Sequence, residues 1–289
     1  MKAILTFALK APISFTEENI TEVERLKFTP CKENDLSVTG FSETVAGDFV
    51  SDISGNTVLV VTTQCKKVNK NELKAKLKVR IEKFEDKFGK VTKEDTDSMS
   101  GEIVRELLPK TYPEEPKDSL VVFTDSLLLI EAASYDKAEE IVGYLRNILG
   151  SLPAIPLQTT KNPDEVLGDI ILDNKTEFTL GNKVIISTDC VDKEGKPHKG
   201  KSSFAKDNVT DAETKRLIKT GSFVDVINLG YEQMSFNLKP DLSISGVKFD
   251  KDLTSDVDKD DGYGSFLLQL NEIELMVTEL VDTFGGIVE

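Results

Sequence analysis

The sequence is short of the residues that build disulfide frameworks and zinc sites. It has no tryptophan, one histidine (His198) and three cysteines, Cys31, Cys65 and Cys190, which are far apart and in no paired motif. This usage predicts no disulfide framework and no zinc site, and it is typical of a reducing cytoplasm. A nucleophilic pair of His198 with one cysteine stays open as an alternative that no local motif supports.

Long apolar runs are also missing. Nothing approaches 18 consecutive apolar residues, so no membrane span is expected. Residues 1–10 are apolar but short and alternating, without a small-residue cleavage site. They predict a first strand rather than a secretory signal.

Positive charge is scarce overall, with 36 basic against 51 acidic residues and a net charge of −15. A nucleic-acid-binding protein is usually basic, because neutralising phosphates releases counterions. A bound ligand, however, responds to charge within about one Debye length, ~10 Å at 0.1 M salt. The position of the cations therefore matters more than the total, and they are segregated.

Hairpins interleave with helices along the chain. Hairpins are predicted at 49–63 and 120–132, further strands at 3–9, 176–186, 223–229, 234–238 and 244–249, and helices at 16–26, 70–88, 93–108, 134–149, 211–220 and 272–284. Without repeating βαβ units this order predicts an α+β fold of hairpins and mixed sheets. Two prolines within 150–157 mark a boundary, which gives regions 1–150, with helices 70–88 and 93–108, and 151–289, with the C-terminal helix.

The segment 66–93 carries most of the clustered positive charge. It has ten lysines and Arg80 against four acids. On a helix Leu73, Leu77, Ile81, Phe84 and Phe88 share one face and are expected to be buried. Beside them runs a stripe, roughly 16 Å long at 1.5 Å per residue, made of Lys76, Arg80, Lys83 and Lys87. The stripe is either a solvated face or a surface that follows phosphates without reading bases.

A second basic stretch contains Lys196, Lys199, Lys201 and Lys206, interrupted by two glycines and a proline. This composition predicts a mobile loop. It is either a flexible arm that grips nucleic acid or an ordinary solvent loop.

Local motifs for catalysis are not found. Residues 256–267 resemble a calcium loop but have Asp261 at the sixth position and Leu267 at the twelfth, so a solvated acidic turn is expected. Gly262 and Gly264 lack the lysine and the preceding strand of a phosphate loop. The sequence predicts no active site, metal or cofactor, although paired carboxylates could hide among 51 acids.

Several short stretches follow one another over nearly the whole chain: residues 28–31 (Phe-Thr-Pro-Cys), 107–112 (Leu-Leu-Pro-Lys-Thr-Tyr), 150–157 (Gly-Ser-Leu-Pro-Ala-Ile-Pro-Leu), 218–221, 247–249 and 284–286. In their order and spacing they resemble the RdgC family of recombination-associated proteins. The chain departs from the family at Ser222, where lysine is common, at 64–67, and in its lack of tryptophan.

The resemblance implies a horseshoe-shaped subunit that closes as a homodimeric ring with a basic channel. It also implies binding to double- and single-stranded DNA without sequence specificity, antagonism of RecA-dependent recombination, and a cytoplasmic, nucleoid-associated location. By position, Lys110 and Lys206 correspond to basic residues of the family, and Tyr112 to an aromatic residue of the ring contact. Two alternatives stay open: a metal-dependent nuclease, and an acidic inhibitor that binds a recombinase directly.

Overall fold

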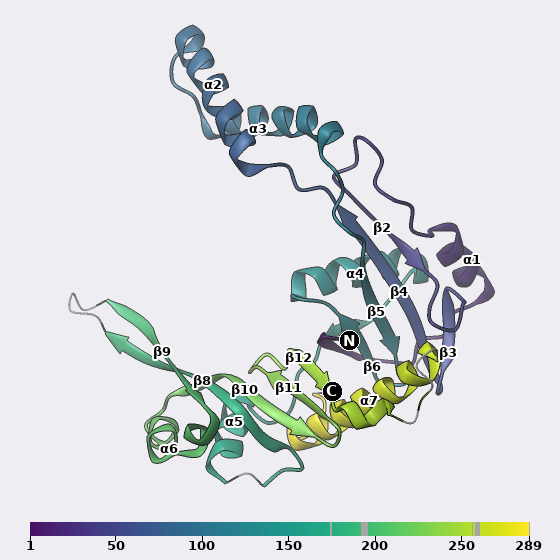
Figure 1. Ribbon diagram of the computed structural model, residues 1–289, viewed down its shortest axis with the longest axis vertical. Coiled ribbons are helices and arrows are strands. Elements are labelled where there is room, and N and C mark those ends of the chain that lie inside the picture. Colours follow the sequence, from purple (N-terminus) through teal and green to yellow (C-terminus); the bar gives the residue numbers. More distant parts are fainter. Residues whose placement is uncertain (174, 192–195, 256, 258–260, 289) are drawn as a thin grey trace. The chain divides into compact units, whose positions relative to one another are not determined.

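The structure is a computed structural model that describes residues 1–173, 175–191, 196–255, 257 and 261–288. Contacts divide the chain into two units: unit 1 is Met1–Asn19, Glu43–Leu59 and Leu120–Glu289, and unit 2 is Ile20–Ser42 and Val60–Ser119. Helices and strands alternate along the chain (Figure 1), which confirms the predicted α+β class. The division at residue 150 and the ring-shaped dimer stay predictions.

Unit 1 is built on a path of hydrogen-bonded strands. Its order is β5 (Lys117–Phe123), β6 (Leu127–Glu131), β1 (Ala3–Leu9), β12 (Ile244–Phe249), β11 (Met234–Leu238), β10 (Phe223–Tyr231), β8 (Thr179–Val191) and β9 (Pro197–Ala205), with β7 (Ala154–Pro156) on β1 and β3 (Val50–Ile53) on β4 (Asn56–Cys65). Every ladder with a described register is antiparallel. The expectation of mixed sheets is therefore wrong for these ladders. Some neighbours, such as β10 and β11, follow each other directly along the chain and are joined by a short turn, which antiparallel pairing allows and parallel pairing does not.

Helices bury the apolar side of this sheet in unit 1. The core joins strands β8, β10, β11 and β12 to the two helices α5 (Pro163–Leu172) and α7 (Gly262–Thr283). The other helices that begin or lie in unit 1 are α1 (Glu17–Arg25), α4 (Tyr135–Leu149), α6 (Ala212–Lys219), η2 (Lys206–Thr210) and η3 (Lys251–Thr254). Helix α7 begins ten residues before the predicted 272, because Asp261 caps it by accepting a hydrogen bond from the Gly264 amide. Of the predicted acidic turn, residues 256 and 258–260 lie outside the described residues.

The prediction of a mobile loop for the second basic stretch is wrong. Residues 197–205 form β9, which pairs with β8 from Lys183↔Ala205 to Val191↔Pro197. Gly200 lies opposite Thr188 in this ladder, and a Cβ at Gly200 would come within 3.1 Å of the Cys190 sulfur. Lys199 and Lys201 are thus held on a β-ribbon, whereas Lys206 follows it at the start of η2.

Unit 2 combines a two-stranded ladder with a helical hairpin. Strand β2 (Ser37–Ser42) pairs with the second half of β4, from Ser37↔Cys65 to Ser42↔Val60. Beyond the strand ends lie α2 (Lys70–Phe88) and α3 (Lys93–Leu107), followed by η1 (Leu108–Lys110) (Figure 1). The predicted caps are present: Asn69 accepts from the Asn71 and Glu72 amides, and Thr92 forms a capping box with Asp95.

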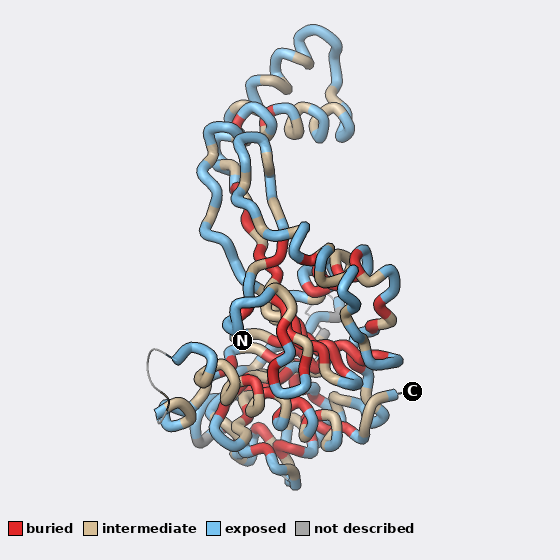
Figure 2. Tube along the Cα trace, turned by 90° about the vertical axis from the view of Figure 1, so that its right-hand side faces the viewer, coloured by how far each residue is buried: buried red, intermediate tan, exposed pale blue. Residues whose placement is uncertain are grey.

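The apolar face of α2 is less buried than its period predicts. Leu73, Leu77, Ile81 and Phe84 are half-buried, Phe88 is 73% exposed, and no residue of α2 is fully buried. Figure 2 shows the same contrast between α2–α3 and the interior of unit 1. The prediction of a buried face is wrong because α2 packs on a single helix, α3, which covers only part of the apolar stripe.

Candidate nucleic-acid interface

The predicted stripe of α2 exists, but its four cations are in different situations. Lys83 and Lys87 are exposed, and within the described residues neither has an acidic partner. Lys76 is half-buried, with its Nζ 3.7 Å from the Glu72 carboxylate one turn earlier. The C-terminal half of α2 therefore presents the two cations best able to meet an external anion.

Arg80 holds the two helices together. Its guanidinium donates to Glu102 at 2.7 Å and also to Glu106, both on α3, and its side chain is 31% exposed. A guanidinium that is paired with two carboxylates has most of its charge and its N–H donors already engaged. Contact of Arg80 with DNA stays a prediction, and its visible role is to fix α3 against α2.

Not every cation of the segment 66–93 faces solvent. Lys66 is 5% exposed and its ammonium donates to the carbonyls of Lys32 (2.8 Å) and Glu33 (2.7 Å). Lys67 is exposed and forms an ion pair at 2.8 Å with Glu114, whose hydrogen bond raises the pKa of Lys67. The whole α2–α3 hairpin, residues 70–107, has ten basic and nine acidic residues. It is nearly neutral because five of the acids lie on α3, after the end of the segment 66–93. Its positive character is local to one face.

Lys110 and Tyr112 lie just after α3. Lys110 ends η1 and is exposed, while the Tyr112 side chain is 91% exposed. Thr111 between them is held by hydrogen bonds to the carbonyls of Leu107 and Leu108. A contact of Tyr112 with a second subunit stays a prediction.

Lys199 and Lys201 are two residues apart on β9, so their side chains lie on the same side of the strand. Lys201 forms an ion pair at 2.9 Å with Asp225, which also accepts a hydrogen bond from the Ser187 hydroxyl at 2.5 Å. Burial would raise the pKa of Asp225, but the Ser187 hydrogen bond and the ammonium groups of Lys201 and Lys199 outweigh it and lower the pKa. One carboxylate thus partly neutralises this lysine pair.

Lys206 begins η2 with a φ of +56° and borders a hollow of about 590 Å³. The other residues that line the hollow are Leu180, Gly181, Asn182, Val209, Thr210, Asn228 and Ser235. Apart from Lys206, this lining has no charge, so the hollow is a polar recess with one cation at its rim.

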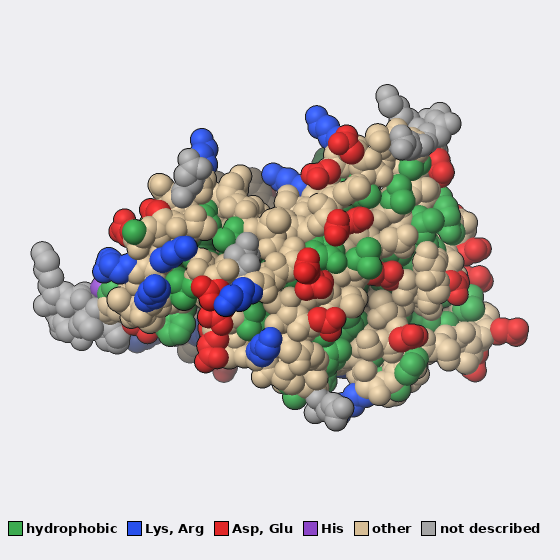
Figure 3. Space-filling view, turned by 90° about the horizontal axis from the view of Figure 1, so that it is seen from below, with side chains coloured by type: hydrophobic (Ala, Val, Ile, Leu, Met, Phe, Trp, Pro, Cys, Tyr) green, Lys and Arg blue, Asp and Glu red, His purple; other side chains and the backbone are tan. Residues whose placement is uncertain are grey.

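The predicted residues fall into one group in each unit. Unit 2 contains Lys76, Arg80, Lys83, Lys87, Lys110 and Tyr112, and unit 1 contains Lys199, Lys201 and Lys206. Figure 3 shows that charge is also segregated on a face of the molecule, with basic side chains gathered toward α6 and acidic ones spread toward α7. Helix α7 carries four acidic and no basic residues. The acidic excess of the sequence is therefore unevenly distributed.

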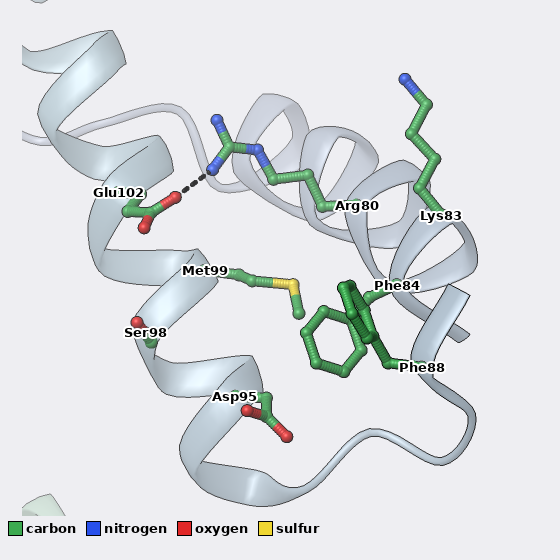
Figure 4. A pocket seen from close by; sticks show the side chains of 8 residues that line it. All are labelled: Arg80, Lys83, Phe84, Phe88, Asp95, Ser98, Met99 and Glu102. Atoms are coloured by element: carbon green, nitrogen blue, oxygen red, sulfur yellow. Dashed lines mark hydrogen bonds and ion pairs between the residues drawn. The ribbon is translucent and has the colours of Figure 1, made fainter. Parts of the chain in front are cut away.

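An aromatic hollow that the sequence did not predict lies between the C-terminal part of α2 and the N-terminal part of α3. A recess of about 380 Å³ is lined by Arg80, Lys83, Phe84, Phe88, Asp95, Ser98, Met99 and Glu102 (Figure 4). The rings of Phe84 and Phe88 lie 4.9 Å apart and are tilted by 46°. The signal was present as two phenylalanines four residues apart just before Gly89, but the helical period was interpreted as core.

Among the described residues, no cluster has three or more His, Cys, Asp or Glu side chains placed to hold a metal ion. His198 lies opposite Cys190 across the β8–β9 ladder, and the Cys190 thiol donates to the Thr188 carbonyl at 3.4 Å. In the same residues, no helix has the length and apolar character needed to cross a membrane.

Comparison with known proteins identifies relatives over the full chain. A family model described as "Putative exonuclease, RdgC" matches residues 1–287. Curated proteins called "Recombination-associated protein RdgC" are similar: that of Pasteurella multocida is 25% identical over 99% of this chain and 97% of its own length, and that of Psychromonas ingrahamii is 27% identical over 97% and 95%. That of Actinobacillus pleuropneumoniae is 26% identical over 100% and 98%. The chain therefore belongs to the RdgC family.

Proposed function

We propose that this chain binds DNA without sequence specificity, closes around it as a homodimeric ring, and limits RecA-dependent recombination. The cations Lys76, Lys83 and Lys87 of α2, with Lys110, Lys199, Lys201 and Lys206, would contact the sugar-phosphate backbone. Membership in a family whose curated relatives are named for recombination supports the association with DNA. The observation that carries the choice of surface is the pair Lys83 and Lys87, exposed on α2 without acidic partners among the described residues.

Backbone binding fits the kind of cation present. Lysine is a compact point charge suited to phosphates, whereas sequence readout relies on arginine, and here Arg80 is already engaged by Glu102 and Glu106. Each phosphate contact should lower the logarithm of affinity by about 0.9 per logarithm of salt on duplex DNA. A protein that uses this surface therefore binds in a strongly salt-dependent manner and with no base preference.

The test replaces both free lysines. In a variant with Lys83→Gln and Lys87→Gln, the salt slope of duplex binding should fall by about 2, and affinity should weaken for every sequence equally. The matched control changes Lys137 and Lys175 to Gln, since both are exposed but already paired with Glu140 and Asp173. Equal slopes for the two double variants would remove α2 from the interface.

The ring is tested by topology. Encirclement predicts that protein loaded on closed circular DNA survives a salt challenge that strips it from linear DNA, because escape from a circle requires the ring to open. Tyr112→Ala should abolish this difference and shift sedimentation toward a monomer, with Tyr112→Phe as the control that keeps the aromatic side chain. A dimeric Tyr112→Ala protein with unchanged retention would refute the assigned contact.

A nuclease is the second candidate, favoured by the description "Putative exonuclease, RdgC". Phosphodiester cleavage by paired metal ions needs carboxylates close together, and the described residues hold no such cluster of three. Linear duplex incubated with Mg²⁺ or Mn²⁺ should stay intact under the binding proposal. Shortening that chelator prevents would establish the enzyme instead.

A further inference from the structure

Unit 1 contains a recess that takes no part in the DNA contacts proposed above. Its volume is about 420 Å³, within the range of small-molecule sites, which begins at roughly 300 Å³. Three segments that are far apart in the sequence line it: the β3–β4 turn, the β5–β6 turn and the middle of α7. None of the lysines assigned to DNA is among its lining residues.

The two turns at this recess are held by local hydrogen bonds. The Gly55 amide donates to the Asp52 carboxylate at 3.0 Å, and Ser54 and Gly55 both have a positive φ, as in a tight hairpin turn. In the β5–β6 turn the Leu127 amide donates to the Thr124 hydroxyl at 3.0 Å. A recess bounded by such turns is largely pre-formed, which lowers the ordering cost of binding a small molecule.

The lining combines negative charge with apolar side chains. Among the described residues that line the recess, Asp125 and Glu274 are acidic and none is basic. No ion pair joins either carboxylate to a cation in the described part of the chain. The apolar part of the lining is buried and consists of Leu127, Leu129 and Val277. This combination suits a cation that carries an alkyl chain.

Glu274 is a carboxylate whose hydrogen bonds are incomplete. The Asn56 side chain donates to it, but its Oε1 is buried and has no hydrogen-bond partner among the described residues. Burial outweighs the Asn56 bond and raises the pKa of Glu274. A buried charge without a cation weakens a fold, so its position in a recess indicates a ligand that supplies the cation. The terminal torsion of a glutamate is soft, and the carboxylate can turn toward such a donor without a movement of α7.

We propose that this recess binds a small aliphatic diamine. One ammonium group donates to the Glu274 carboxylate, the alkyl chain lies on the apolar part of the lining, and the other ammonium group meets Asp125. Ammonium–carboxylate hydrogen bonds are charge-assisted and therefore among the stronger ones. A metal ion suits the recess less well, since no three potential metal ligands gather among the described residues. The inference goes beyond the proposed function and stands or falls independently of it.

Isothermal titration calorimetry of the full chain with putrescine tests the site. Glu274→Gln keeps the shape of the side chain and removes its charge, so it should weaken binding at least about tenfold. Glu279→Gln is the matched control, because it removes the same charge from the same helix at a position outside the lining, where the Glu279 carboxylate accepts from the Thr283 hydroxyl. Its affinity should change less than about twofold at physiological salt. Unfolding cannot imitate the loss, since removal of an uncompensated charge should stabilise the fold, and the melting temperature of Glu274→Gln checks this.

Further ligands make the assignment specific. Butylamine keeps the alkyl chain and one ammonium group, so it should bind the wild type about tenfold more weakly than putrescine, and Asp125→Asn should remove this difference. Equal effects of Glu274→Gln and Glu279→Gln would overturn the site, because binding would then reflect the acidic charge of the whole chain. Displacement of putrescine by an equal concentration of Mg²⁺, or no saturable binding to the wild type, would overturn it as well. A capped lysine peptide that binds more tightly than putrescine would replace the free diamine with a protein side chain as the ligand.

Discussion

Replacing Lys66 with methionine should destabilise unit 2, although Lys66 belongs to the basic stretch 66–93. Its ammonium group donates to the carbonyls of Lys32 at 2.8 Å and Glu33 at 2.7 Å, with a longer contact of 3.5 Å to Leu108. Leu108 is the C-cap of α3, where a cation is favoured by the carbonyls at the helix end. The side chain thus ties the segment 32–33 to the base of the hairpin.

The magnitude follows from the two short bonds. Hydrogen bonds from a charged donor contribute about 1.5–3 kcal/mol each, and a carbonyl left without its donor costs about 1–3 kcal/mol when buried. Methionine recovers part of this loss, because it fills the same space without the cost of removing an ammonium group from water. A net loss of about 2 kcal/mol remains, which corresponds to roughly 8–16 °C in the midpoint of a unit of this size.

The neighbouring residue is the matched control. Lys67→Met removes the same charge, but Lys67 is 69% exposed and has only a surface ion pair with Glu114. Such pairs contribute about 0–1 kcal/mol. Differential scanning calorimetry of the two variants, with hydrogen exchange to locate the loss in unit 2, makes the comparison. Midpoints that agree within about 1 °C would refute the argument that the Lys66 ammonium stabilises this region.

Two further predictions concern stability. Gly40→Ala should destabilise the fold by more than about 2 kcal/mol, because a Cβ at Gly40 would lie 2.5 Å from the Phe28 Cα. Gly101→Ala, in open space on α3, is the control and should stabilise the fold by up to about 1 kcal/mol. Chemical unfolding measures both free energies, and similar effects of the two substitutions would contradict the close approach at Gly40. Burial raises the pKa of Glu274, and its Oε1 has no hydrogen-bond partner in the described part of the chain. A raised folded-state pKa gives stability that is present below the unfolded value and lost as pH rises through the folded one. Glu274→Gln should therefore raise the melting temperature by a few degrees at about pH 8 and very little at about pH 4, and an equal gain at both would contradict the cause.

Most elements could be predicted from the sequence, because their signals are local. Asn69, Thr92, Ser134 and Gly150 bound helices through hydrogen bonds or backbone angles that involve only near neighbours. Strand β9 could not be predicted in this way. Its glycines and lysines are typical of a loop, and only pairing with β8 along nine residues makes them a strand.

In the candidate site, too, the local features could be predicted and the long-range contacts could not. The stripe of α2 is a consequence of helical spacing, so the order of residues is enough to predict it. The state of each cation depends on distant partners: Arg80 is bound by two carboxylates more than twenty residues away, and Lys66 is buried against carbonyls from the segment 32–33. Such partners are brought together by folding and leave no mark in local composition.

By itself, the sequence determined the α+β class, most helix boundaries, the concentration of lysine on α2 and the family resemblance, because spacing and capping act over a few residues. Tertiary structure alone decided which cations remain free and which apolar residues stay in solvent. Burial and charge pairing depend on what packs against a face. The apolar face of α2 is wide enough to be buried in a core, but only one helix, α3, packs against it. That difference left Phe88, the last residue of α2, 73% exposed.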